Sequence, residues 1–131
     1  MTTVLFACVH NAGRSQMAAA WFNALADPAK ARATSAGTHP GSHVHPSVVE
    51  AMREAGLDLT GAQPHRLTDQ LASDAQWLIT MGCGEECPVV PGVKREDWAI
   101  DDPAALPIAR VREIRDEIRT RVEAFLERER L

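Results

Sequence analysis

Short apolar runs alternate in this chain with stretches whose apolar residues recur every three or four positions. Residues 4–7 and 76–81 are apolar-rich runs of the kind that form strands buried on both faces of a sheet. Residues 32–36, followed by Gly37, and residues 98–100 are shorter segments that we also expect to be strands. The pattern therefore predicts four strands.

Helical periodicity fills the intervals between these strands. The first helix has its apolar stripe at Met17, Ala18, Trp21, Phe22 and Leu25. Residues 45–55, closed by Gly56, and residues 67–72 predict two further helices. The last helix has one apolar face, made of Val111, Ile114, Ile118, Val122, Phe125 and Leu126. We expect Trp21 and Phe22 to lie in the core and the charged face of the last helix to be solvated.

Strands that alternate with helices of this length predict an α/β fold, with a parallel, doubly wound sheet and helices on both faces. Ligands of such sheets bind outside the carboxyl ends of the strands. Cys8, Cys83 and Asp102 each follow the end of a predicted strand. We therefore expect these three side chains to meet at one edge of the sheet.

Composition narrows the class of protein. A length of 131 residues with 45% hydrophobic residues fits a single domain, residues 1–131, with a real core. The formal net charge of −4 argues against a nucleic-acid partner. The first residues lack the pattern of a signal peptide, and no apolar stretch approaches the ~18 residues that span a bilayer. We expect a soluble cytoplasmic protein with no membrane partner, whose three cysteines are working thiols.

The segment from Cys8 to Ser15 lies at the turn from the first strand to the first helix. Free N–H groups converge at such a turn and the helix dipole adds positive charge, so it can hold a tetrahedral anion. Thiols under such donors ionise readily, which makes Cys8 a candidate nucleophile. The planar fork of Arg14 can grip two oxygens of phosphate or arsenate. The residues expected to line this oxyanion site are Val9, His10, Asn11, Ala12, Gly13, Arg14 and Ser15.

Two cysteines stand four residues apart in the segment Cys83-Gly84-Glu85-Glu86-Cys87. If the segment coils, their Cα atoms come within the roughly 4.4–6.8 Å that a disulfide tolerates. Polar neighbours favour an accessible, reducible disulfide with a redox role. The alternatives are two buried core thiols or half of a zinc site.

Other polar residues near the expected site are candidates for narrower roles. Asp102, immediately before Pro103, is a candidate general acid, although Asp-Pro also forms ordinary turns and Asp101 competes for the role. Three histidines lie close together in a loop that lacks nearby cysteine or carboxylate ligands: His39, His43 and His45. We predict no metal ion there.

These motifs together resemble the arsenate reductases related to low-molecular-weight tyrosine phosphatases, over essentially the whole chain. The resemblance rests on residues 8–18, Ser35-Ala36-Gly37, the Cys83 and Cys87 pair, and Asp101-Asp102-Pro103. It implies a flavodoxin-like fold with four parallel strands and reduction of arsenate to arsenite.

The resemblance also implies a thiol relay, with no bound cofactor. In it Cys8 attacks arsenate held by Arg14 and the loop, and Asp102 assists the departure of an oxygen. Cys83 then attacks Cys8 and releases arsenite, and Cys87 attacks Cys83 to leave a disulfide that thioredoxin reduces.

Alternatives stay open at this stage. A tyrosine phosphatase would need only Cys8, Arg14 and Asp102, but that family typically has an aromatic residue where Ala104 follows Pro103 here. The spacer between the last two cysteines is shorter than in many thioredoxin-coupled relatives, and some relatives use a low-molecular-weight thiol with a glutaredoxin-like protein. A sensor that binds oxyanions without turnover is a third reading. Relatives that bind potassium use an acidic residue that the first helix lacks, so we predict no such ion site.

Overall fold

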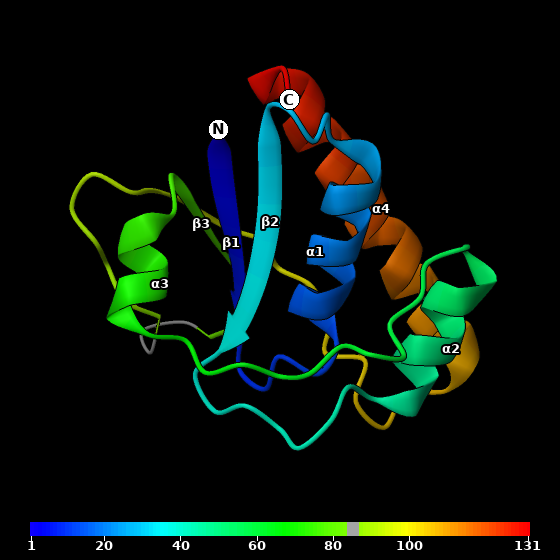
Figure 1. Ribbon diagram of the computed structural model, residues 1–131. Helices are drawn as coiled ribbons and strands as arrows, with labels where there is room; N and C mark the ends of the chain where they lie inside the picture. The colour runs from blue at the N-terminus through cyan, green and yellow to red at the C-terminus, as the bar shows by residue number, and fades with distance from the viewer. Residues whose placement is uncertain (84–86) are drawn as a thin grey trace.

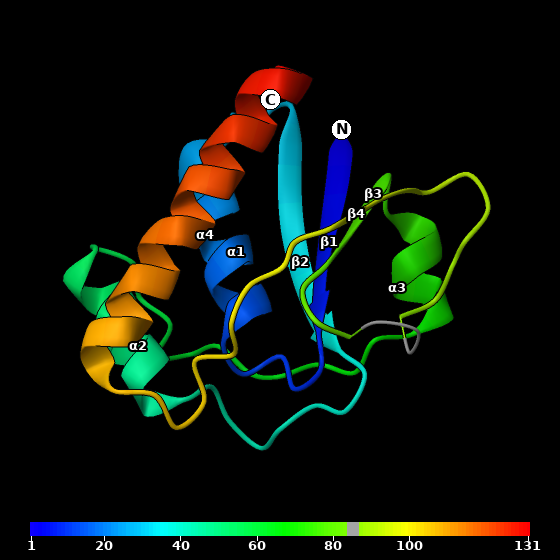
Figure 2. The same ribbon diagram turned by 180° about the vertical axis from the view of Figure 1, so that it is seen from behind.

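Four parallel strands form the centre of the molecule in the order β2-β1-β3-β4 (Figures 1 and 2). The computed structural model describes residues 1–83 and 87–131. The strands are β1 (Thr2–Cys8), β2 (Ala31–Gly37), β3 (Trp77–Thr80) and β4 (Lys94–Asp97). Their carboxyl ends lie at one edge of the sheet, opposite the two chain termini.

Helices cover both faces of this sheet. The helices α1 (Arg14–Leu25), α2 (Pro46–Glu54) and α4 (Ile108–Glu129) lie on one face, and α3 (Asp69–Asp74) lies on the other (Figures 1 and 2). The predicted three-layer α/β architecture with a four-stranded parallel sheet is therefore confirmed.

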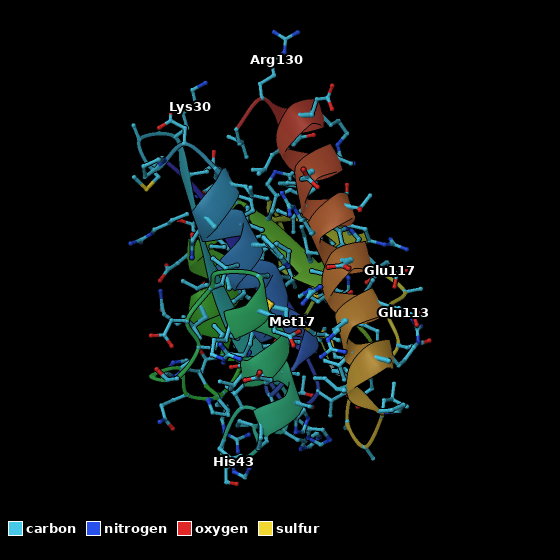
Figure 3. All side chains as sticks on the ribbon, turned by 90° about the vertical axis from the view of Figure 1, so that its right-hand side faces the viewer. Met17, Lys30, His43, Glu113, Glu117 and Arg130 are labelled. Carbon is cyan, nitrogen blue, oxygen red and sulfur yellow. A yellow bond between two sulfur atoms is a disulfide. The ribbon has the colours of Figure 1, made fainter. Side chains whose placement is uncertain are left out.

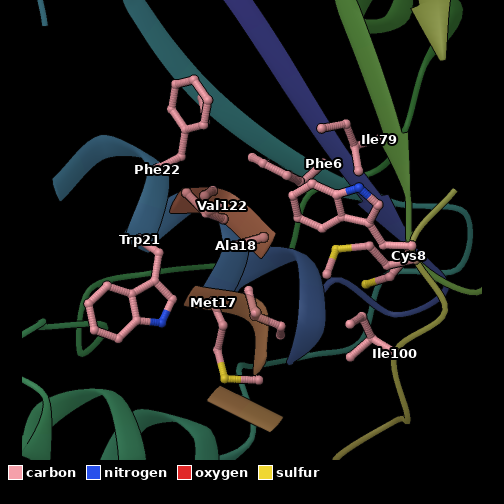
Figure 4. Packing of buried hydrophobic residues seen from close by; sticks show 14 of the residues in the cluster. Phe6, Cys8, Met17, Ala18, Trp21, Phe22, Ile79, Ile100 and Val122 are labelled. Carbon is pink, nitrogen blue, oxygen red and sulfur yellow. The ribbon is translucent and has the colours of Figure 1, made fainter. Parts of the chain in front are cut away.

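The alternation of side chains along β1 feeds two hydrophobic clusters. Val4 and Phe6 point into the larger cluster, while Leu5 and Ala7 point into the smaller one on the α3 side. All four side chains are fully buried, as expected of a central strand. In the larger cluster Phe6 packs against Phe22 and neighbouring apolar side chains of α1 and α4 (Figure 4).

Three sequence predictions about elements need correction. The strand expected at residues 98–100 is wrong, because the fourth strand is the charged segment Lys94–Asp97. Among residues 1–83 and 87–131, β3 alone pairs with this edge strand, so backbone hydrogen bonds form it while its charged residues are exposed or half-buried. The helix expected at 67–72 is displaced, because Thr68 caps α3 by accepting a hydrogen bond from the N–H of Leu71. Leu25, assigned to the apolar stripe of the first helix, is exposed.

The charged residues of α4 divide between solvent and a contact with α2. Glu113 and Glu117 project from the outer side of the helix (Figure 3). Arg112 instead donates two hydrogen bonds to the Glu54 carboxylate of α2, at 2.9 and 2.8 Å. This partner lowers the pKa of Glu54 below its ordinary value. None of the helices in the described part of the chain could cross a membrane.

Candidate active site

The loop of residues 9–13 connects β1 to α1 at the carboxyl edge of the sheet (Figure 1). Cys8, the last residue of β1, is 2% exposed and lies at the border of the larger cluster near Ile100 (Figure 4). The N–H of Asn11 points at its sulfur at 3.3 Å, and the Ser15 hydroxyl lies 2.8 Å from the same atom. The loop therefore wraps around a single buried thiol.

A second loop, segment 38–45, orients the peptides of the first. Four of its N–H groups donate to carbonyls of the Cys8 loop at 2.7–3.2 Å: Thr38 to Cys8, His39 to Val9, Gly41 to His10, and His45 to Ala12. In a planar trans peptide, the carbonyl of one residue and the N–H of the next point in opposite directions. The N–H groups of the following residues therefore face the inside of the loop, as the Asn11 N–H to sulfur contact shows. Backbone donors thus converge where an oxyanion would sit.

Helix α1 adds its own donors to this cradle. Its first intrahelical hydrogen bond runs from Met17 N–H to Gly13 O, and Gly13 provides no side-chain cap. The N–H groups of the first turn, before Met17, therefore have no partner within the helix. Gly13 also admits Pro103, because a Cβ at residue 13 would lie 2.8 Å from the Pro103 ring. The Asp-Pro segment can thus approach the start of α1.

Hydrogen bonds determine which way the side chains around Cys8 point. The backbone N–H of His65 can only donate, and it donates to Asn11 Oδ1 at 2.9 Å. The Asn11 amide nitrogen therefore faces Ser15 and donates to its hydroxyl oxygen at 2.7 Å. The remaining Ser15 hydrogen is free to donate to the Cys8 sulfur. This direction places a hydrogen-bond donor on the sulfur of the candidate nucleophile.

Arg14 occupies the side of the site that faces the loop after β4. One guanidinium nitrogen donates to the Ile100 carbonyl at 3.2 Å, and another lies 3.7 Å from the Asp102 carboxylate. The guanidinium is nearly buried and passes directly beside Gly82. A Cβ at residue 82 would overlap the guanidinium, so the missing side chain makes room for it.

The two neighbouring aspartates take different positions. Asp102 faces Arg14 and accepts a hydrogen bond from the N–H of Ala104 at 3.0 Å. Asp101 instead pairs with Arg110 of α4 at 2.7 Å. The geometry therefore places Asp102, and not Asp101, beside the arginine of the loop.

Cys83 and Cys87 form a disulfide with a Cα–Cα distance of 5.7 Å. Their expected accessibility is wrong, because Cys83 is 6% and Cys87 is 2% exposed. Both pack in the smaller cluster, where residues such as Ala7, Ala36 and Ala72 leave room for sulfur. Cys8 is the free cysteine of the chain and belongs to the larger cluster. Residues 84–86, which complete the predicted redox segment, lie outside the described residues.

Several residues of the site escaped the sequence interpretation. Gln16 donates hydrogen bonds to both oxygens of Asn11, and Gly82 makes room for Arg14. Segment 38–45 acts through backbone groups, which leave no residue pattern. Gln16 directly follows Arg14-Ser15 in the sequence and could have been included in the predicted site for that reason. Its hydrogen bonds to Asn11 are seen only in the folded structure. No group of three potential metal ligands occurs in residues 1–83 and 87–131. The His10 ring lies within hydrogen-bond distance of the His39 carbonyl.

The chain is similar to known proteins over nearly its whole length. A model of the family called low molecular weight phosphotyrosine protein phosphatase matches residues 3–131. A putative arsenate reductase of Halobacterium salinarum is 43% identical over 124 residues, covering 89% of this chain and 85% of that protein. The thioredoxin-dependent arsenate reductase Cg_ArsC1' of Corynebacterium glutamicum has a TM-score of 0.84 at 38% identity, over 97% of this chain but 61% of that one. An arsenate reductase in the phosphate binding state has a TM-score of 0.84 at 30% identity, over 98% of both chains.

Proposed function

This chain belongs to the low molecular weight phosphotyrosine protein phosphatase family, and we propose that it reduces arsenate to arsenite and is regenerated by thioredoxin, as the names of its arsenate reductase relatives suggest. The observation that carries the proposal is one free thiol inside an oxyanion loop, with a disulfide at the end of the neighbouring strand. The loop alone would suit phosphoryl transfer equally well. The disulfide favours redox chemistry, because arsenic(V) accepts two electrons from thiols readily whereas phosphorus(V) does not.

The proposed reaction begins in the loop. The Cys8 thiolate attacks arsenate and forms a sulfur–arsenic bond, while inward N–H groups and Arg14 hold the remaining oxygens. Asp102, 3.7 Å from Arg14, donates the proton with which one oxygen leaves as water. This chemistry requires no bound cofactor.

The resolving thiols complete the proposed cycle. The Cys83 thiolate attacks the Cys8 sulfur, so that the sulfur–arsenic electron pair remains on arsenic and arsenite leaves. Cys87 then attacks Cys83 and restores the Cys8 thiolate. The structure, with Cys83 bonded to Cys87 and Cys8 free, has the arrangement that one turnover would leave. Thioredoxin would reduce this disulfide, in a cytoplasm that keeps thiols reduced.

Replacement of each cysteine tests the relay. With limiting protein that has been fully reduced beforehand and then freed of reductant, wild type should release one arsenite per chain, form the Cys83–Cys87 disulfide and then stop. Cys8→Ser should release none, and Cys83→Ser should also release none. Cys87→Ser should release one but lose sustained arsenate-dependent NADPH oxidation with thioredoxin and its reductase.

Two controls are needed: one for the effect of a new hydroxyl on packing, and one for phosphatase activity. Ala72→Ser places a hydroxyl in the same buried cluster as the two half-cystines and should keep full thioredoxin-coupled activity. Any aryl-phosphate hydrolysis should survive in Cys83→Ser and vanish in Cys8→Ser. Sustained thioredoxin-coupled turnover by Cys83→Ser or Cys87→Ser would contradict the relay and favour a small thiol with a glutaredoxin-like protein. Aryl-phosphate hydrolysis without arsenite release would favour the phosphatase.

A further inference from the structure

The side chain of Gln16 is 6% exposed and its amide nitrogen faces three oxygen atoms. Gln16 Nε2 donates to the Asn11 carbonyl at 3.2 Å, to Asn11 Oδ1 at 3.1 Å and to the Gln63 carbonyl at 3.0 Å. The nitrogen carries two hydrogens for these three acceptors. Gln16 therefore ties the Cys8 loop to the segment that contains Gln63 and His65.

The first of these bonds completes the orientation of the loop peptides. Segment 38–45 holds the carbonyls of Cys8, Val9, His10 and Ala12 but not that of Asn11. Gln16 supplies the donor for the Asn11 carbonyl. Because a trans peptide sets carbonyl and N–H in opposite directions, this bond turns the N–H of Ala12 toward the inside of the loop. Asn11 needs such support, since its φ of 50° is left-handed.

The second bond acts on the thiol through two side chains. Gln16 and the His65 N–H both donate to Asn11 Oδ1, which keeps the Asn11 amide nitrogen directed at Ser15. Ser15 then has its own hydrogen available for the Cys8 sulfur, 2.8 Å away. One buried amide thus supports both an oxyanion donor and the donor to the nucleophile.

We propose that Gln16 is a positioning residue, which aligns the Ala12 N–H for oxyanion binding and directs the Ser15 hydroxyl at Cys8. The inference rests on the proposed function only in taking Cys8 as the nucleophile. It makes a double prediction, because loss of the Gln16 amide should weaken anion binding and lower the reactivity of the thiol at neutral pH. A role in packing alone would change neither property.

The test uses full-length protein with the Cys83–Cys87 disulfide intact, so that Cys8 is the one free thiol. Iodoacetamide alkylation of Cys8 is followed against pH, and inorganic phosphate is titrated as a protecting anion. Gln16→Met keeps the length of the side chain but removes the donor. Gln63→Met is the matched control, because Gln63 is exposed and contributes only its backbone carbonyl to Gln16.

Gln16→Met should slow the alkylation of Cys8 at pH 7 about fivefold, because losing a hydrogen bond of about 1 kcal/mol to Asn11 loosens the Asn11 and Ser15 side chains that reach the sulfur. It should also weaken protection by phosphate about tenfold. Gln16→Glu, which brings a carboxylate to the same three oxygens, should weaken phosphate protection further at pH 8. The control should match wild type in both readouts.

An alkylation profile and a phosphate affinity unchanged in both Gln16 variants would overturn the inference, even if the variants melt at lower temperature. Neither readout requires turnover. If the Gln16 variants change both alkylation and phosphate protection but the wild-type protein releases no arsenite, the result counts against the proposed function and not against the role of Gln16.

Discussion

A single methyl group at residue 82 should separate the position of Arg14 from the stability of the fold. Gly82 has a φ of 97°, and a Cβ there would lie 3.2 Å from Arg14 Cζ and overlap its nearest guanidinium nitrogen. The clash is with the far end of a flexible side chain, so Gly82→Ala should fold. The guanidinium, however, must move away from its place beside Ile100 O.

Two costs follow, and they have different sizes. A side chain in left-handed backbone costs about 1–2 kcal/mol relative to glycine. In a protein of this size that corresponds to a fall in Tm of roughly 3–8 °C. Displacing a substrate-holding group by about 1 Å can cost about 100-fold in rate. We therefore expect Gly82→Ala to lose about 100-fold in kcat/KM for arsenate.

Gly92→Ala and Gly56→Ala provide the matched controls. Their φ values are 85° and 87°, and a Cβ at either position would meet no atom within 4 Å. Both controls should show the same fall in Tm as Gly82→Ala but keep wild-type kcat/KM. Equal activity losses in all three variants would mean that the loss comes from backbone strain and not from displacement of Arg14.

Three further changes test other contacts. Ser15→Ala removes the hydroxyl 2.8 Å from the Cys8 sulfur and should slow the alkylation of Cys8 at pH 7 about 10- to 100-fold, since a hydrogen bond to a charged group contributes roughly 1.5–3 kcal/mol. An unchanged rate would contradict this. Asp102→Asn should lower kcat for arsenate about 100-fold while Cys8 alkylates normally, and wild-type turnover would exclude Asp102 as the acid. The pKa of Glu54 is lowered by Arg112, so the carboxylate stabilises the fold above its unfolded-state pKa and the effect disappears as pH falls. Glu54→Gln should therefore lower Tm at pH 7 but not at pH 2, and equal losses at both values would contradict the pair.

Much of the fold follows from local patterns in the sequence. The predicted strands at residues 4–7 and 76–81 lie within or overlap β1 and β3, because apolar runs mark strands that are buried. The predicted strand at residues 32–36 lies within β2, whose first residues alternate between buried and exposed. The fourth strand could not be found in this way. Residues 94–97 are all charged, and they form a strand because β3 offers its free edge to their backbone.

The candidate nucleophile and its loop can be predicted from the amino-acid sequence, since Cys8 to Ser15 are contiguous and a strand-to-helix turn gathers N–H groups in any such fold. The folded arrangement was needed to show that Asp102 and not Asp101 faces Arg14, and that Cys83 and Cys87 are buried. It alone decided that segment 38–45 and Gln16 orient the loop. These features depend on contacts between segments far apart in the chain, and many of them are made by backbone groups that every residue shares.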